Sequence, residues 1–333
     1  MATYQQDEEQ EIYVANINRD EMRSGYLVTS DVKKLWNAQI GLIKEFERIC
    51  KKHNLRWFAI GGTLLGAARH GGFIPWDDDV DIAMLRPDYE KFRKIAADEI
   101  KPPYHLDIWY NYRFEVDKPS ELTDNSLPLI SRKHHKKHPL SAPLFPLIKL
   151  RDTRTLFVEF PEERTFNQGV WIDIFPLDSL PPFDNKQQRL KFDSERAFYI
   201  AAVHPEIIID TLQKNRRVVV DNDTLQEFMS LPYKQRAMQV DKILAENFFM
   251  SEHIGDLRSW CLAQSQRFYQ SKDFRGVTYL PFERIEIPAP VGYESILTDF
   301  YGDWRTPIQT HTHAKIYSVE ISWEEYLQKT ASK

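Results

Sequence analysis

The sequence predicts an α/β fold, in which a mixed β-sheet is flanked by helices and a helical lobe is added beside it. Three features predict this class. A glycine-rich stretch at residues 60–74 joins two strand-like segments and leads into four aspartates within five residues. A later apolar strand at 170–175 carries one aspartate, and the pattern from about 184 to 270 is mostly helical. The 333 residues are enough for one large domain or two of ordinary size.

The composition excludes several classes of protein. A net charge of −5 gives no general reason to expect nucleic-acid binding. Cys50 and Cys261 lie far apart without metal-type spacing, which argues against a disulfide framework or a zinc ribbon. The first thirty residues are polar and acidic, unlike a signal peptide, and no apolar run approaches the roughly 18 residues of a membrane span. We therefore expect a cytoplasmic protein and leave peripheral contact with the inner face of the membrane open.

The N-terminal region is expected to form an arm followed by a long helix. Residues 1–28 read as an extended arm whose apolar residues 12–14 dock on the body. Ser30 is placed to cap the helix, which ends near His53. Apolar residues recur along it at the spacing of one buried stripe, namely Val32, Leu35, Trp36, Ile40, Ile43, Phe46, Ile49 and Cys50.

The glycine-rich stretch predicts a strand, a turn, a short helix and a second strand. The first strand covers 55–60 and ends in the turn Gly61-Gly62, the helix covers 63–70, and the second strand covers 79–84. Glycines at such a turn allow backbone N–H groups to approach an anionic ligand closely. This turn is therefore a candidate for binding phosphate.

Asp79 and Asp81 are the first candidates for a metal site. Alternate residues of a strand point to the same face, so the two carboxylates should lie together while their apolar neighbours point to the core. Such like charges repel unless a cation lies between them, and paired carboxylates suit Mg²⁺. A calcium loop of the EF-hand type is excluded, because counting from Asp77 puts Ile82 and Asp88 where it needs Gly and Glu.

The chain after these aspartates alternates between helix and strand. We expect a helix at 88–97, strands at 105–110 and 127–130, and a hairpin at 144–160. The basic run 132–138 between them has two interpretations, a solvated connector or a contact with an anionic acceptor or lipid surface.

Asp173 is the one charged residue in the apolar strand 170–175. An unpaired charge in such a strand is costly, so the carboxylate needs a partner. A metal shared with Asp79 and Asp81 is one candidate partner, and a structural ion pair is the other. No Lys or Arg is adjacent in the strand itself.

The expected domains follow from this reading. A catalytic core covers 29–183, a helical lobe 184–280, and a C-terminal segment 281–333 that returns to the catalytic cleft. Within that segment we expect a short strand at 282–290 and a short helix at 291–300. The helices expected in the lobe are 186–203, 222–230, 233–249 and 256–270.

Three blocks of sequence resemble one known family. The glycine-rich and aspartate block 61–81, the block Trp171-Ile172-Asp173-Ile174-Phe175-Pro176-Leu177-Asp178 and the block Tyr301-Gly302-Asp303-Trp304 occur in the order found in the LicD family of phosphocholine transferases. That family belongs to the nucleotidyltransferase superfamily. The resemblance covers roughly residues 30–310, and the chain is similar, more distantly, to fukutin-related ribitol-phosphate transferases.

The resemblance implies a nucleotidyltransferase-like sheet and a phosphotransferase activity. The donor would be CDP-choline or another CDP-alcohol. The acceptor would be a hydroxyl of a glycan or lipid-linked glycan, such as teichoic acid, lipopolysaccharide or capsular polysaccharide, and CMP would leave. Asp79, Asp81 and Asp173 would be the catalytic residues and would hold Mg²⁺, as two ions that Mn²⁺ could replace. No nucleic-acid partner is expected.

Ten residues are candidates for binding the substrates. Arg69, Lys149 and Arg151 could contact phosphate, or could be surface ion-pair residues. Tyr301 and Trp304 could face a quaternary ammonium group, or could pack in the core. The full set is Gly61, Gly62, Thr63, Arg69, Lys149, Arg151, Tyr301, Trp304, His311 and His313.

Two other functions stay open on sequence alone. A nucleotidyltransferase acting on a nucleoside triphosphate would release pyrophosphate instead of CMP. A non-catalytic binding subunit would release neither, although the intact trio of carboxylates argues against it.

Overall fold

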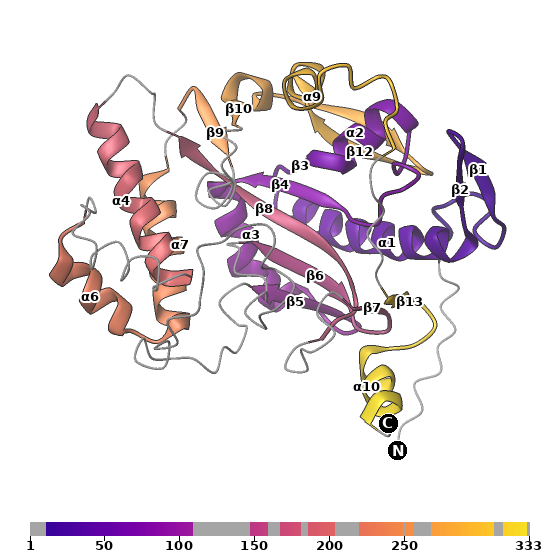
Figure 1. The fold of residues 1–333 in the computed structure, drawn as a ribbon, viewed down its shortest axis with the longest axis horizontal. Helices are drawn as coiled ribbons and strands as arrows, with labels where there is room; N and C mark the ends of the chain where they lie inside the picture. The colour runs from indigo at the N-terminus through magenta and orange to yellow at the C-terminus, as the bar shows by residue number, and fades with distance from the viewer. Residues whose placement is uncertain are drawn as a thin grey trace.

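The computed structural model describes residues 11–108, 147–158, 167–180, 186–203, 220–248, 251–255, 268–309 and 316–331. The first half contains β1 (Glu21–Arg23), β2 (Tyr26–Val28), α1 (Ser30–Lys52), β3 (Phe58–Ala59), α2 (Gly61–His70), β4 (Asp81–Leu85), α3 (Arg86–Glu99), β5 (Tyr104–Ile108), β6 (Ile148–Asp152), β7 (Leu156–Val158) and β8 (Val170–Leu180). The second half contains α4 (Lys186–Val203), α6 (Asn222–Ser230), α7 (Tyr233–Asn247), β9 (His253–Gly255), β10 (Tyr269–Gln270), the 3-10 helix η4 (Ser271–Phe274), β11 (Val277–Phe282), β12 (Ile285–Pro290), α9 (Tyr293–Tyr301), β13 (Ile316–Ser318) and α10 (Trp323–Ala331). The predicted α/β class, with a central mixed sheet and flanking helices, is confirmed (Figure 1).

The central sheet is built around β8. Its strand order is β10-β9-β8-β4-β3, and β6 pairs with both β5 and β8. The eleven-residue β8 can hold three partners because β6 lies along its first half and β9 along its end. β4 and β8 are parallel, whereas the other pairs are antiparallel. The strands predicted at 55–60, 79–84 and 170–175 enter this sheet as β3, β4 and β8, but β4 begins at Asp81, so Asp79 lies before the strand and not beside Asp81 within it.

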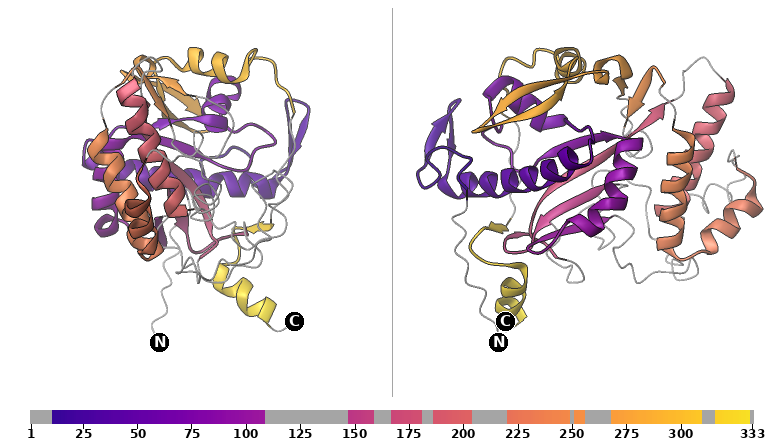
Figure 2. Two further views of the ribbon diagram at one scale, coloured as in Figure 1. Left: turned by 60° about the vertical axis from the view of Figure 1, so that its left-hand side comes forward. Right: turned by 180° about the vertical axis from the view of Figure 1, so that it is seen from behind.

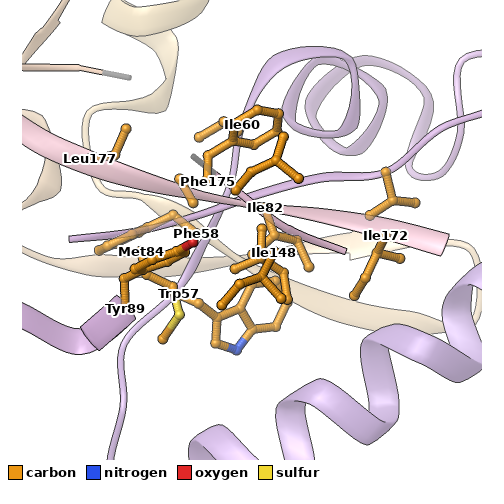
Figure 3. Close-up of a cluster of buried hydrophobic side chains, with 14 of the residues drawn as sticks. Trp57, Phe58, Ile60, Ile82, Met84, Tyr89, Ile148, Ile172, Phe175 and Leu177 are labelled. Carbon is orange, nitrogen blue, oxygen red and sulfur yellow. The ribbon is translucent and has the colours of Figure 1, made fainter. Parts of the chain in front are cut away.

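One face of the sheet packs on α1 and α3. Ile82, Ile148 and Ile172 come from three neighbouring strands and lie beside Trp57 in this apolar layer (Figure 3). All four side chains are at most 5% exposed. Because strand residues alternate, the residues between these isoleucines point to the opposite face of the sheet. That opposite face carries the candidate site.

The long helix and the docked arm are present, with one correction. The N-cap of α1 is Thr29 and not Ser30: the Thr29 hydroxyl accepts from the N–H of Val32 at 3.3 Å, and Ser30 is already helical. Thr29 has the extended backbone that a cap requires. In the arm, Val14 is fully buried and the N–H of Tyr13 donates to Asn37 at 2.7 Å. The arm also contains the hairpin β1–β2, which the sequence analysis did not predict.

The predicted hairpin at 144–160 and the predicted strand at 282–290 have pairing partners that differ from the prediction. β6 and β7 do not form the hairpin expected at 144–160, because both edges of β6 are occupied by β5 and β8. β7 pairs instead with β13, more than 150 residues later. The single strand expected at 282–290 is the second arm of a hairpin, β11–β12, with its turn at Glu283-Arg284.

The helical lobe forms at one end of the sheet, opposite β1 and β2 (Figures 1 and 2). α4, α6 and α7 match three of the predicted helices, and α7 packs against α3. Of the fourth, 256–270, residues 256–267 lie outside the described residues, and Tyr269 and Gln270 are in strand β10. The predicted strand 127–130 and the basic run 132–138 also lie outside them. Among the helices that the structure describes, none is long and apolar enough to cross a membrane.

Candidate active site

The Gly61-Gly62 turn brings the start of α2 against two carboxylates. Gly61 has φ +55°, and a Cβ there would lie 2.8 Å from Asp81 Oδ2. A Cβ on Gly62 would lie 2.5 Å from Asp77 Oδ2. The N-cap of α2, Ile60, makes no side-chain capping bond, so the positive end of the helix dipole faces these carboxylates. The absence of side chains at both glycines is therefore what allows the carboxylates to approach.

Thr63 holds Asp81 in place. The N–H of Asp81 donates to Thr63 Oγ1 at 2.9 Å, and the N–H of Ile60 donates to the carbonyl of Asp81 at 3.2 Å. Thr63 is only 5% exposed. These bonds tie the first residue of β4 to the first turn of α2, which gives Thr63 a positioning role in the structure.

Asp173 lies next to Asp81. The two residues are register partners on the adjacent parallel strands β8 and β4, and the N–H of Asp173 donates to the carbonyl of Val80 at 2.9 Å. Residues at matched positions of neighbouring strands point to the same face. A metal shared by Asp81 and Asp173, one of the two partners considered for Asp173, requires this neighbouring arrangement of the strands.

Lys149 is the partner of Asp173 in this structure. Lys149 is in register with Asp173 from β6, and its Nζ lies 3.0 Å from Asp173 Oδ1. The ammonium also lies 4.2 Å from the centre of the Trp171 ring. The structural ion pair considered for Asp173 is therefore present. Sequence inspection along the strand missed it because the partner comes from another strand, 24 residues earlier.

Among the residues that the structure describes, Asp77, Asp78 and Asp79 form a group of carboxylates, here called the acidic cluster. Ligand oxygens of the three residues all lie within 4.8 Å of one another. Burial, followed by the charges of Asp79 and Asp78, raises the pKa of Asp77 to about 8. Of these three residues, only Asp79 is among the metal ligands predicted from the sequence. The signal was visible, because four aspartates occur within five residues.

Two side chains of helix α1 hold the backbone of the acidic cluster by hydrogen bonds. Trp36 Nε1–H donates to the carbonyl of Asp77 at 3.0 Å, and Gln39 Nε2–H donates to the carbonyl of Asp78 at 2.8 Å. Both Trp36 and Gln39 are buried in the body of the protein. The backbone of the cluster is thus fixed to the longest helix of the core, which favours a constant spacing of its carboxylates.

Carboxylate oxygens in this arrangement fit a hard divalent cation. Mg²⁺ binds through one or two carboxylates and leaves its other positions to water and phosphate. Burial and the charges of Asp79 and Asp78 raise the pKa of Asp77, and a bound cation would offset this cost by neutralising the carboxylates. The donor set therefore fits Mg²⁺, or Mn²⁺ by the same chemistry.

Arg69 and Trp304 meet at the other end of α2. Arg69 Nη1 donates to the carbonyl of Trp304 at 3.0 Å, and burial lowers the pKa of Arg69. Trp304 is 5% exposed, and the guanidinium of Arg305 lies 4.2 Å from its ring centre. Tyr301, at the end of α9, is 41% exposed. The C-terminal segment thus returns to α2, at the end opposite the glycine turn.

Arg151 has a different position from the one its candidate role requires. Its side chain is fully buried, forms an ion pair with Asp107 and donates to the carbonyl of Gly169 at 3.0 Å. Its guanidinium lies 5.1 Å from the ring centre of Trp171. These contacts place Arg151 in the structural interior of the sheet and not on a surface open to phosphate. His311 and His313 lie outside the described residues.

Comparison with known proteins gives one matching family model and several similar transferases. Residues 54–187 match the family model for the LicD/FKTN/FKRP nucleotidyltransferase domain. The chain is 24% identical over 275 residues to the lipopolysaccharide cholinephosphotransferase LicD of Haemophilus influenzae, covering 80% of this chain and 88% of that protein. It is 56% identical over 45 residues to the human ribitol 5-phosphate transferase FKRP, covering 14% of this chain and 9% of FKRP. The chain therefore carries a LicD/FKTN/FKRP nucleotidyltransferase domain at residues 54–187 and is similar over most of its length to a named cholinephosphotransferase, which supports a phosphotransferase.

Proposed function

We propose that the protein transfers a phospho-alcohol from a CDP-linked donor to a hydroxyl of a cell-surface glycan and releases CMP. The observation that carries this proposal is the register match of Asp81 and Asp173 beside the acidic cluster, inside the domain that matches the LicD family. Phosphoryl transfer asks a protein mainly to position its reactants and neutralise charge, and a carboxylate site for a divalent ion serves that need.

Asp79 and Asp81 are the proposed holders of Mg²⁺, and the geometry of the acidic cluster adds Asp77 to them. A bound Mg²⁺ would polarise the donor diphosphate and neutralise the charge that develops on it. The Gly61-Gly62 turn lets Asp81 and Asp77 lie against this end of α2, where a bound cation would face the donor. One of the site aspartates accepts the proton of the attacking hydroxyl.

Phosphocholine is the first candidate for the transferred group. The relative that aligns with most of this chain is named a cholinephosphotransferase acting on lipopolysaccharide. The exposed ring of Tyr301 is available to a quaternary ammonium group, whereas Trp304 already packs against Arg305. Ribitol phosphate is the second candidate, since FKRP is named a ribitol 5-phosphate transferase.

A donor assay tests the proposal. The protein is incubated with CDP-choline, CDP-ribitol or CDP-glycerol and a lipopolysaccharide or teichoic-acid acceptor, with Mg²⁺ or with excess chelator, and CMP is measured. We expect acceptor-dependent CMP release with Mg²⁺ and none in chelator. Asp79→Asn should abolish release, whereas Asp98→Asn, an exposed position near the end of α3, should not. Pyrophosphate release from a nucleoside triphosphate, without CMP release, would support the nucleotidyltransferase alternative instead.

A further inference from the structure

We infer that Lys149 is a built-in cation of the active site, which takes the place of a second metal ion at Asp173, so that the site binds one divalent ion. This inference rests on the proposed function, because it takes Mg²⁺ as the cofactor of the acidic cluster. It changes the expected arrangement of two ions bridged by Asp79, Asp81 and Asp173. The charge of Asp173 is balanced by the protein itself.

Four charged residues form a row across the sheet. Asp81 on β4 is in register with Asp173 on β8, Asp173 with Lys149 on β6, and Lys149 with Asp107 on β5. All four side chains belong to the face opposite the isoleucine layer. Lys149 therefore lies on the same face of the sheet as the catalytic carboxylates, on the strand β6 next to the strand of Asp173.

The contact between Lys149 and Asp173 is well buried. Nζ and Oδ1 are 3.0 Å apart, and the two side chains are 4% and 15% exposed. Burying either charge alone would be costly, so the contact stabilises both side chains in this position. The Trp171 ring at 4.2 Å further stabilises the charge of Lys149 in this position.

The carboxylate on the other side of Lys149 has its own partners. Asp107 forms an ion pair with the buried Arg151, and His105 Nε2 lies 3.0 Å from Asp107 Oδ1. The charge of Lys149 is therefore not needed to balance Asp107. The ammonium contacts Asp173, at the catalytic end of the row.

The carboxylates that converge for a metal form a set without Asp173. Among the described residues, the group of three whose ligand oxygens lie within 4.8 Å of one another is Asp77, Asp78 and Asp79. A second divalent ion on Asp173 would have to bind beside an ammonium that already contacts the same carboxylate. Like charges at such distances repel strongly when they are shielded from water. One ion at the acidic cluster, with Lys149 at Asp173, satisfies the charges without that repulsion.

Manganese binding to the purified protein tests this arrangement without any donor. Free Mn²⁺ is counted by electron paramagnetic resonance during titration. We expect the wild-type protein to bind one ion. The double variant Lys149→Met/Asp173→Asn removes both charges together and should also bind one ion. Its affinity should stay within about threefold of wild type, because the ligands of the metal site are unchanged. Asp79→Asn should weaken binding by about tenfold or more.

Three results would overturn the inference: two ions bound to wild type, no ion bound to wild type, or loss of the site in the double variant. The wild-type count needs no variant to fold. A one-ion result without CMP release from any donor would contradict the proposed reaction and leave the inference standing. CMP release by an enzyme that binds two ions would support the proposed reaction and contradict the inference of a single ion.

Melting temperatures in chelator test the ion pair itself. Lys149→Met and Asp173→Asn should each lower the melting temperature, because each leaves one buried charge alone. The double variant should lose less than the sum of the two single losses. Additive losses would mean that the two side chains do not interact, and would also overturn the inference.

Discussion

At the scale of single residues, the site depends on the absence of side chains at the start of α2. Gly61 combines a left-handed backbone with a Cβ position only 2.8 Å from Asp81 Oδ2. Gly41, in the middle of α1, has helical geometry and no atom within 4 Å of its Cβ position. The two glycines therefore offer a matched pair of substitutions.

Gly61→Ala should destabilise the protein by about 1–2 kcal/mol through its backbone alone, and should also displace Asp81 and reduce transferase activity. Gly41→Ala should be neutral or stabilising by up to about 1 kcal/mol, since alanine favours a helix interior. Urea denaturation and CMP release measure the two effects. Normal activity in a folded Gly61→Ala protein would show that Asp81 does not need this close approach.

Asp77 gives the metal-free protein a distinctive pH dependence. Its pKa is raised from 3.8 to about 8 in the folded protein, first by burial and then by Asp79 and Asp78. Between these values the folded state binds a proton that the unfolded state has lost, so stability should fall as pH rises from about 4 to about 8. Melting temperatures in chelator should show this fall, and Asp77→Asn should reduce it. Saturating Mg²⁺ should oppose it, because the cation favours the ionised carboxylate.

At the scale of elements, the turn of the β11–β12 hairpin holds the loop between α2 and the acidic cluster. Glu283 pairs with Arg23 at 2.5 Å, accepts from the N–H of Phe73 at 3.3 Å, and lies against Gly72. The N–H of Glu283 in turn donates to the carbonyl of Gly71 at 2.8 Å. One side chain thus joins β1, the α2–β4 loop and the C-terminal hairpin.

Glu283→Gln should therefore cost about 1–3 kcal/mol of stability, because Arg23 loses a largely buried charged partner. Glu286→Gln, an exposed position on β12 in the same hairpin, should cost less than about 0.5 kcal/mol. Chemical denaturation of both variants measures the difference. Equal stabilities would show that the ion pair with Arg23 contributes nothing measurable.

At the scale of the whole molecule, Arg86 joins the helical lobe to the sheet. Its fully buried guanidinium donates to both carboxylate oxygens of Asp178 on β8, at 2.6 and 2.8 Å, and lies 3.5 Å from Asp241 on α7. Burial alone would lower the pKa of Arg86, but Asp178 and Asp241 raise it. The lobe is therefore attached through a buried charge network as well as through apolar packing.

Arg86→Met should destabilise the protein by about 3–5 kcal/mol, because it leaves buried carboxylates without their partner. Amide hydrogen exchange should rise in α4, α6 and α7 as the lobe loosens. Arg93→Met is the control, since Arg93 is partly exposed and forms an ion pair with Glu90 within the same helix; it should cost less than about 1 kcal/mol. Unchanged exchange in the lobe of Arg86→Met would rule out this mode of attachment.

The sequence by itself determined the local order of the catalytic region. The α/β class, the strand–turn–helix–strand order at 55–85 and the resemblance to the LicD family followed from glycine placement, residue alternation and three sequence blocks. These features depend on contacts between residues close in the chain, or on the need of a buried carboxylate for a partner. Short stretches of sequence are therefore enough to predict them.

The tertiary structure alone decided which partners meet. It paired Lys149 with Asp173, buried Arg151 against Asp107, and joined β7 to β13. Each partnership depends on strand register, which is set by how the whole sheet packs on α1 and α3 and which no short stretch of sequence specifies. The aspartates predict that a charge must be balanced at this site, and only the assembled sheet shows that a lysine from β6 lies where it can balance it.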